Sequence, residues 1–180
     1  MQYIPKKQFN NVKYVSMDMN STYRDFAYHH FKGCIVMADS FHVIKNINDA
    51  LRNLRIRIMN KYERTNKEYY LLKHWNYLLM KRNGDIEDNI PKYNKKIGYA
   101  INKLGILEMI LEIDPVLKKA YRWKEDYLDF NEDYSFENAS ERFDELYTQL
   151  VEMNINEFKD VVSLLKNWKK EIINSFITID

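Results

Sequence analysis

Cysteine, glycine and proline are all scarce in this chain. Its 180 residues include one cysteine, Cys34, together with four glycines and three prolines. A single cysteine excludes an intramolecular disulfide framework and a cysteine-based zinc site, and it favours a reducing, intracellular environment. Few glycines and prolines favour long regular elements. We therefore expect a fold built from helices and strands without covalent cross-links.

Long apolar runs and the common nucleotide and nucleophile motifs are also missing. The most apolar stretches, CIVMA and ILEMILEI, are much shorter than the roughly 20 residues that cross a bilayer. The stretch MQYIPKKQFNN has no apolar signal-peptide core. The sequence has no phosphate-binding glycine loop and no Ser-x-x-Lys or Gly-x-Ser-x-Gly nucleophile motif. These absences predict a soluble, cytoplasmic protein with no membrane partner.

Charge is present in quantity and is unevenly distributed. Hydrophobic residues make up 46% of the chain, which is ample for a core, and the net charge is +2. Residues 1–82 contain 15 Lys and Arg against 6 Asp and Glu, whereas residues 83–180 contain 13 against 20. A basic half beside an acidic half indicates a polyanion-binding surface next to a lobe of opposite charge. Solvated faces of unrelated helices would give the same counts, so charge alone leaves both interpretations open.

The first 40 residues contain a strand-helix-strand pattern. Residues 12–17 are rich in Val and Tyr and precede a polar stretch in which Asn20 or Ser21 can cap a helix. The aromatic residues of 22–31 recur at helical spacing, and 34–38 is a continuous apolar run typical of a strand covered on both sides. A helical crossover between two strands predicts that they are parallel neighbours.

A long helix is predicted from Ser40 to about Tyr62. Spacings of three and four residues place Lys45, Arg52 and Arg55 in one basic stripe. The opposite, apolar face is formed by Val43, Ile47, Ala50, Leu51, Leu54 and Ile58.

The rest of the chain is predicted to be helical apart from polar breaks. After a linker at residues 83–91, the sequence Asp114-Pro115 is typical of a helix start. The expected helices cover residues 68–82, 92–113, 115–130, 137–153 and 155–176. The fold class is therefore α+β, mostly α.

Three residues at the predicted strand ends could carry chemistry. Asp18 and Asp39 each follow a strand, and the carboxyl ends of parallel strands meet at one sheet edge, where carboxylates can hold a metal. His42 lies three residues after Asp39, so the two side chains can face the same space. Two structural interpretations compete: Asp18 as a turn residue, and Asp39 or Ser40 as a helix cap with His42 packed in the first turn.

The same stretch resembles a known family. The patterns Val-x-x-Val-Ser-x-Asp-Met, ending at residue 19, and Val-x-Ala-Asp-x-Phe-His-Val, at residues 36–43, are similar to the central part of bacterial insertion-sequence transposases of the ISL-three type. The segments DPVLKKAYRWKEDY and LLKNWKKEIINSF resemble the helical region of that family. The resemblance thus covers nearly the whole chain.

The resemblance implies a ribonuclease-H-like fold interrupted by a helical insertion, with residues 1–62 as part of the catalytic core and residues 63–180 as the insertion. Such enzymes hold Mg²⁺ or Mn²⁺ on an Asp-Asp-Glu site and cleave and join DNA at transposon ends, typically as homo-oligomers. Asp18 matches the second acid of that site. Asp39 and His42 match an auxiliary Asp-x-x-His element, and an alternative alignment makes Asp39 the second acid.

Two departures from the family pattern limit what the resemblance implies. Ser40 stands where the family usually has Arg, which removes one phosphate contact. The first Asp and the last Glu have no counterpart in this sequence, so we expect a fragment of a transposase catalytic domain that does not cleave DNA by itself. The alternative hypotheses are a non-catalytic DNA- or protein-binding helical module and a helical interaction protein unrelated to nucleic acid.

Overall fold

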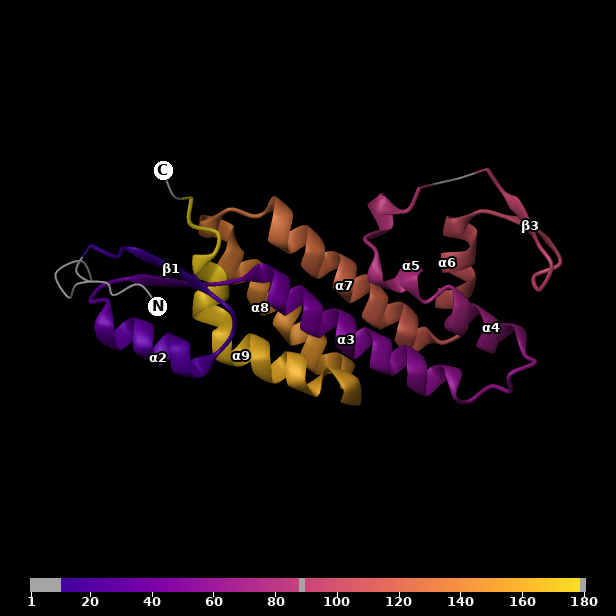
Figure 1. Cartoon of the computed structure of the whole chain (residues 1–180), viewed down its shortest axis with the longest axis horizontal. Coiled ribbons are helices and arrows are strands. Elements are labelled where there is room, and N and C mark those ends of the chain that lie inside the picture. Colours follow the sequence, from indigo (N-terminus) through magenta and orange to yellow (C-terminus); the bar gives the residue numbers. More distant parts are fainter. Residues whose placement is uncertain (1–10, 88–89, 179–180) are drawn as a thin grey trace, which may run out of the picture.

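The chain forms an elongated molecule whose longest helix connects two different ends. The computed structural model describes residues 11–87 and 90–178. A parallel strand pair lies at one end and a β-hairpin at the other, with helices between them (Figure 1). The fold is therefore α+β and mostly α, as the sequence predicts.

The strand-helix-strand pattern is confirmed. Strand β1 (Tyr14–Met17), helix α2 (Ser21–His30) and strand β2 (Ile35–Ala38) follow one another, and the two strands pair in parallel from Tyr14 opposite Ile35 to Met17 opposite Ala38. The side chain of Asn20 caps α2, because its Oδ1 accepts a hydrogen bond from the Thr22 amide at 2.9 Å.

Helix α3 (Ser40–Met59) has the predicted apolar face, but not the complete basic stripe. All six predicted apolar residues are buried, and Lys45 and Arg52 are exposed. The prediction that Arg55 shares their exposed face is wrong, since only 8% of it is accessible. Helix α4 (Lys67–His74) packs on that side of α3, and the Arg55 guanidinium donates a hydrogen bond to the Leu72 carbonyl at 2.8 Å.

A helical array forms the remainder of the fold. Asp114 caps α7 directly before Pro115, as the sequence predicts, by accepting a hydrogen bond from the Val116 amide at 2.9 Å. One cluster of buried residues extends from Ala38 to Ile172 and includes side chains from both sides of residue 62. The helices are α5 (Tyr77–Met80), α6 (Lys103–Leu111), α7 (Pro115–Asp133), α8 (Phe136–Met153) and α9 (Lys159–Asn174), with 3-10 turns η1 (Asn83–Asp85) and η2 (Asn156–Phe158).

The expectation of a helix over residues 92–113 is wrong in its first half. Strands β3 (Lys92–Asn94) and β4 (Tyr99–Ile101) form an antiparallel hairpin, and α6 begins only at Lys103. Gly98 has a φ of +92°, which glycine adopts at little cost and which ends a helix. The apolar residues of this segment have helical spacing, but the turn at Gly98 makes the segment a hairpin instead of a helix.

Helix α9 holds the strand pair in place. The Asn174 side chain donates a hydrogen bond to the Val36 carbonyl of β2 at 2.8 Å. Arg24 of α2 also contacts α9, since it donates to the Asn167 carbonyl at 2.9 Å and lies 4.4 Å from the centre of the Trp168 ring. The last helix therefore fixes the position of the first supersecondary unit.

Within the described residues, no helix is both long enough and apolar enough to span a bilayer.

Candidate functional site at the strand ends

The two predicted acids lie at the same edge of the parallel strand pair. Because Met17 pairs with Ala38, Asp18 and Asp39 are the next residues on neighbouring strands. The Asp39 amide donates to the Met17 carbonyl at 2.8 Å, which carries the pairing up to this edge. Asp18 is exposed, and its carboxylate makes no hydrogen bond or ion pair with the other described residues. The edge thus presents one free carboxylate.

Asp39 caps the long helix and orients His42. Its Oδ1 accepts a hydrogen bond from the Phe41 amide at 3.0 Å, and its Oδ2 lies 3.1 Å from Nδ1 of His42. The structural interpretation in which Asp39 caps this helix, with His42 in its first turn, is therefore confirmed. Because Nδ1 of His42 faces the Asp39 carboxylate, the tautomer with its proton on Nδ1 is favoured. Nε2 of His42 is then available as an acceptor or ligand.

The donor set at this edge does not complete the three-carboxylate site that the resemblance implies. Asp18 and Asp39 are the two acids at the strand ends, and Asp39 is already engaged with the helix start and with His42. Among residues 11–87 and 90–178, no three His, Cys, Asp or Glu side chains are grouped so that they could hold a metal ion. The described residues alone therefore do not fit a two-metal centre.

The predicted basic residues on α3 differ in their availability. Lys45 is exposed, whereas Arg52 donates to the Asp49 carboxylate at 2.7 Å, and Arg55 is buried against α4. Arg57, farther along α3, and Lys61, just after the end of that helix, hold neighbouring elements.

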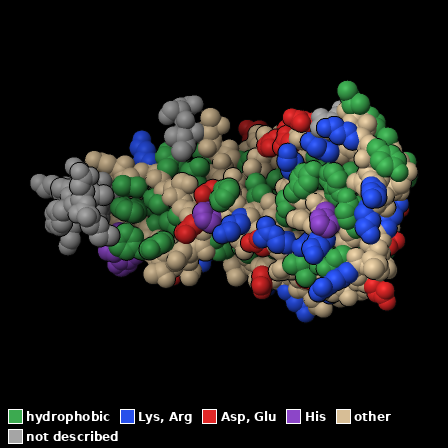
Figure 2. Space-filling model, turned by 45° about the vertical axis from the view of Figure 1, so that its right-hand side comes forward, with side chains coloured by type: hydrophobic (Ala, Val, Ile, Leu, Met, Phe, Trp, Pro, Cys, Tyr) green, Lys and Arg blue, Asp and Glu red, His purple; other side chains and the backbone are tan. Residues whose placement is uncertain are grey.

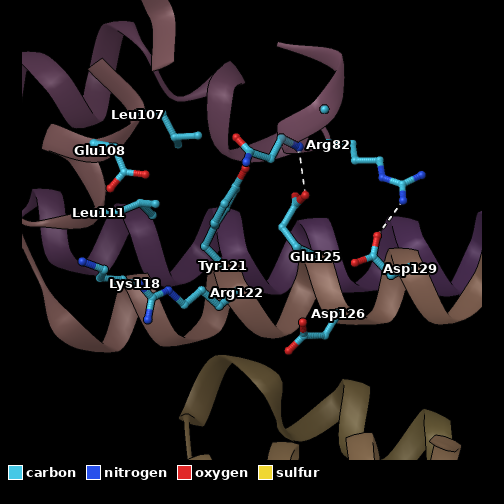
Figure 3. A pocket seen from close by; sticks show the side chains of 12 residues that line it. Arg82, Leu107, Glu108, Leu111, Lys118, Tyr121, Arg122, Glu125, Asp126 and Asp129 are labelled. Atoms are coloured by element: carbon cyan, nitrogen blue, oxygen red, sulfur yellow. Dashed lines mark hydrogen bonds and ion pairs between the residues drawn. The ribbon is translucent and has the colours of Figure 1, made fainter. Parts of the chain in front are cut away.

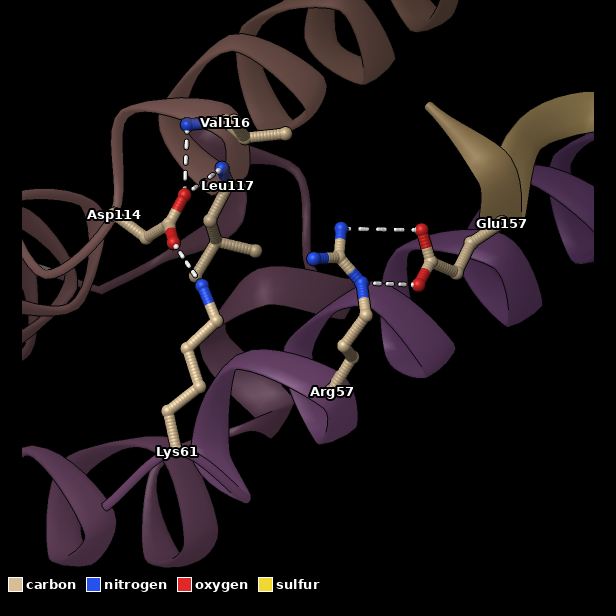
Figure 4. A network of polar contacts seen from close by, with 6 residues as sticks. All are labelled: Arg57, Lys61, Asp114, Val116, Leu117 and Glu157. Atoms are coloured by element: carbon tan, nitrogen blue, oxygen red, sulfur yellow. Dashed lines mark hydrogen bonds and ion pairs between the residues drawn. The ribbon is translucent and has the colours of Figure 1, made fainter. Parts of the chain in front are cut away.

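Figure 4 shows those two contacts side by side. Arg57 pairs with Glu157 of η2 through two nitrogens, and Lys61 donates to Asp114, the cap of α7, at 3.2 Å. These charges stabilise helix packing, so Lys45 and Arg52 are the exposed basic residues of α3 that do not hold a neighbouring element.

Comparison with known families identifies the chain. A family model described as Transposase, for DDE enzymes of the ISL-three type, matches residues 1–179. The chain belongs to this transposase family. No curated protein and no solved structure matches it. In this member of the family, Asp18 and Asp39 directly follow β1 and β2, and the helical region packs on β2 through α9.

A cleft of about 640 Å³ with many charged side chains in its lining lies between α6, α7 and η1 of this transposase (Figure 3). Some of its lining side chains are already engaged: Arg82 contacts Asp129 at 2.5 Å and also Glu132, while Glu125 accepts from the Asn83 amide at 2.8 Å. These contacts join the start of η1 to α7.

Sequence reasoning missed the basic hairpin of the transposase. Lys92, Lys95 and Lys96 are all exposed on it. Two signals in the sequence could have found it: Asn94, whose side chain is suited to starting a turn, and Gly98, which ends one. The flanking Lys-Tyr-Asn and Tyr-Ala-Ile segments are short, so helical spacing masked them.

Proposed function

We propose that this chain is part of the catalytic domain of a DNA transposase and supplies the second carboxylate, Asp18, to a divalent-metal site. The observation that supports the proposal is the position of Asp18 and Asp39 at the carboxyl edge of a parallel strand pair, in a member of the transposase family. Carboxylates at such an edge are the ligands that Mg²⁺ and Mn²⁺ prefer.

The free state of its carboxylate favours Asp18 over Asp39 as the metal ligand. Both oxygens of Asp39 have partners within its own helix start, whereas Asp18 is exposed and unpaired within the described part of the chain. Binding a metal through Asp39 would compete with the α3 cap, at a cost of about 1 kcal/mol. Asp39 and His42 are therefore proposed as an auxiliary pair that fixes the edge and places the His42 ring beside it.

The reaction proposed for the intact transposase is metal-dependent cleavage and transfer of DNA strands. That chemistry requires three carboxylates around two metal ions, and the described residues supply fewer free ones. We therefore propose that this chain, tested alone, does not cleave DNA. Lys45 and Arg52 are proposed to contact transposon-end DNA, while residues 63–180 act as the insertion that contacts DNA or a second subunit of a homo-oligomer. Arg55 is not included, because it is buried.

Metal binding at Asp18 can be measured directly on this chain. Paramagnetic Mn²⁺ at millimolar concentration is expected to broaden the NMR amide signals of residues around Asp18 and Asp39, because few ligands give weak binding. Asp18→Asn should remove the broadening. Asp25→Asn is the matched control, since Asp25 is an exposed acid on α2 of the same unit. Equal broadening in wild type and Asp18→Asn would contradict the assignment.

Activity provides the second measurement. In a transposase that joins this sequence to its remaining acids, Mg²⁺-dependent nicking should be lost in Asp18→Asn and retained in Asp25→Asn. Nicking that survives the loss of Asp18 would contradict its assignment as the second acid, and nicking that also survives Asp39→Asn would favour the second candidate function, a DNA- or protein-binding helical module. The observation that favours this alternative is the engagement of Asp39 in helix capping, which leaves a single free acid at the edge.

A further inference from the structure

The β3–β4 hairpin concentrates positive charge at the end of the molecule opposite the strand pair (Figure 1). Residues 90–107 contain four lysines and no Asp or Glu. We propose that this hairpin binds the phosphate backbone of duplex DNA, as a second contact remote from the strand-end acids. The inference rests on the proposed function, since it takes the substrate to be DNA, and it adds a binding site to that function.

Strand register divides the hairpin into an inner and an outer face. Asn94 lies opposite Tyr99, and Tyr93 lies opposite Ala100, so these two pairs point to opposite sides. The inner pair is held: the Asn94 amide donates to the Tyr70 hydroxyl of α4 at 3.2 Å, and the Tyr99 hydroxyl lies 3.5 Å from the sulfur of Met109. The outer face is open, and Tyr93 is 71% accessible next to the small Ala100.

The turn of the hairpin is ordered by the chain itself. The Asn94 side chain accepts hydrogen bonds from the Lys96 amide at 3.0 Å and the Ile97 amide at 3.1 Å. Ile97 is only 8% accessible and belongs to the main core, which anchors the turn. A fixed turn presents Lys95 and Lys96 without first ordering a loop, and this lowers the entropic cost of binding.

The lysines of the hairpin tip are available to a ligand. Lys103 approaches Glu87 at 3.7 Å, but Lys92, Lys95 and Lys96 form no ion pair with any other residue in the described ranges. Figure 2 shows Lys and Arg side chains gathered on the half of that face that carries the hairpin and α4. Unpaired ammonium groups and an exposed tyrosine on one hairpin are a combination that binds nucleic-acid backbones.

Helix α3 spans much of the distance between the two contacts (Figure 1). This helix has 20 residues, and at about 1.5 Å per residue it is about 30 Å long. Asp39 lies at its first end, while α4, on which the hairpin packs, follows its second end. One turn of B-DNA is about 34 Å, so a duplex that reaches from the strand-end acids to the hairpin covers about one helical turn. Two-stranded ribbons of this size fit a DNA groove.

The test compares two triple variants that lose the same charge. The hairpin variant Lys92→Gln, Lys95→Gln, Lys96→Gln removes the proposed contacts, and the variant of Lys119, Lys159 and Lys166 to Gln removes three exposed lysines from α7 and α9. Binding of a labelled 30-base-pair duplex is followed by fluorescence anisotropy at several salt concentrations, starting at 50 mM. Circular dichroism checks that each variant is folded.

The hairpin variant should bind more weakly, and its plot of log affinity against log salt should be less steep by about 0.9 for each lost phosphate contact, or about 2 to 3 in total. The control variant should keep the wild-type slope. Tyr93→Ala should weaken binding without changing the slope, because it removes no charge. Equal weakening in both triple variants would overturn the hairpin assignment, since net charge alone would explain it.

The remaining outcomes separate this inference from the proposed function. If wild type binds the duplex and the hairpin variant binds it equally well, only the hairpin assignment is overturned. If wild type does not bind DNA at 50 mM salt, the proposed function of this chain fails together with the inference.

Discussion

Replacement of Lys124 by methionine is expected to destabilise the transposase, because the side chain of this residue is the most deeply buried cation of the fold among the described residues. Lys124 is 1% accessible. Its ammonium group donates to the carbonyls of Leu79 at 3.1 Å and Lys81 at 2.7 Å, at the end of α5, and lies 2.6 Å from the Glu125 carboxylate. It thereby joins α7 to α5, which in turn packs on α6 below the hairpin.

The expected change in the free energy of unfolding combines two opposing effects of Lys124→Met: the loss of an ion pair and the loss of a desolvation cost. Removing one partner of a buried ion pair costs about 3–5 kcal/mol, because the other charge is left uncompensated. Glu125 keeps a hydrogen bond from the Asn83 amide at 2.8 Å, and its side chain is 18% accessible. The cost of leaving the Glu125 charge without Lys124 is therefore smaller than that range. Methionine has no ammonium group, so the free-energy cost of desolvating that group in the folded protein is removed. A net loss of about 2–3 kcal/mol in the free energy of unfolding results, or about 5–10 °C in Tm for a chain of this length.

Urea denaturation followed by circular dichroism measures this loss. Lys119→Met is the matched control, since Lys119 is exposed on the same helix and its replacement should change stability by less than about 0.5 kcal/mol. A Lys124→Met protein as stable as wild type would refute the reasoning, because it would mean that desolvation of the ammonium group costs as much as its hydrogen bonds contribute.

Titration of Lys124 gives a second readout for the same substitution. Burial lowers the pKa of Lys124 in the folded protein, while the unfolded chain keeps a value of about 10.5. Between these two values the unfolded state binds the extra proton, so the free energy of unfolding should rise as pH increases toward about 10.5. Lys124→Met should lack this contribution, and identical pH profiles for the two proteins would contradict it.

Three other substitutions test the junctions of the fold. Gly98→Ala meets no neighbouring atom but must adopt a φ of +92°, so urea denaturation should show a loss of about 1 kcal/mol or more, and DNA affinity should fall with the turn geometry; an unchanged hairpin would contradict this. Tyr28→Phe removes the hydrogen bond to Glu171 at 2.9 Å, and because partial burial and then this bond raise the pKa of Tyr28 to about 12, wild type should lose stability as pH rises from about 10 to 12 and the variant should not. Arg24→Gln removes the contact with the Trp168 ring, so the free energy of protection against amide hydrogen exchange in α2 should fall by about 1 kcal/mol, and unchanged protection would argue against a role for this contact.

The hydrophobic core bears on how the proposed catalytic and insertion parts relate. Side chains of α3 pack with those of α7 and α9 in one cluster, and α9 also bonds to β2. The proposed division at residue 62 is therefore one of function between two regions that share a core. A substitution in the insertion helices is expected to shift the strand-end acids, because α9 connects those helices to β2.

The sequence by itself determined the elements whose signals are local. Asn20 and Asp114 cap their helices through amides two residues away. The apolar spacing in α3 and the run in β2 needed only their own periodicity to be assigned correctly. The strand-end positions of Asp18 and Asp39 follow from the same local pattern and from the handedness of a parallel crossover.

Only the tertiary structure decided the features that depend on distant partners. Arg55 is buried because the Leu72 carbonyl accepts its hydrogen bond, and Lys124 is buried because Leu79, 45 residues earlier, provides an acceptor. The hairpin formed where helical spacing was equally good, since Asn94 and Gly98 close a turn that Ile97 anchors in the core. Periodicity records which face of an element is apolar, but the charges that the fold covers depend on which other elements pack there.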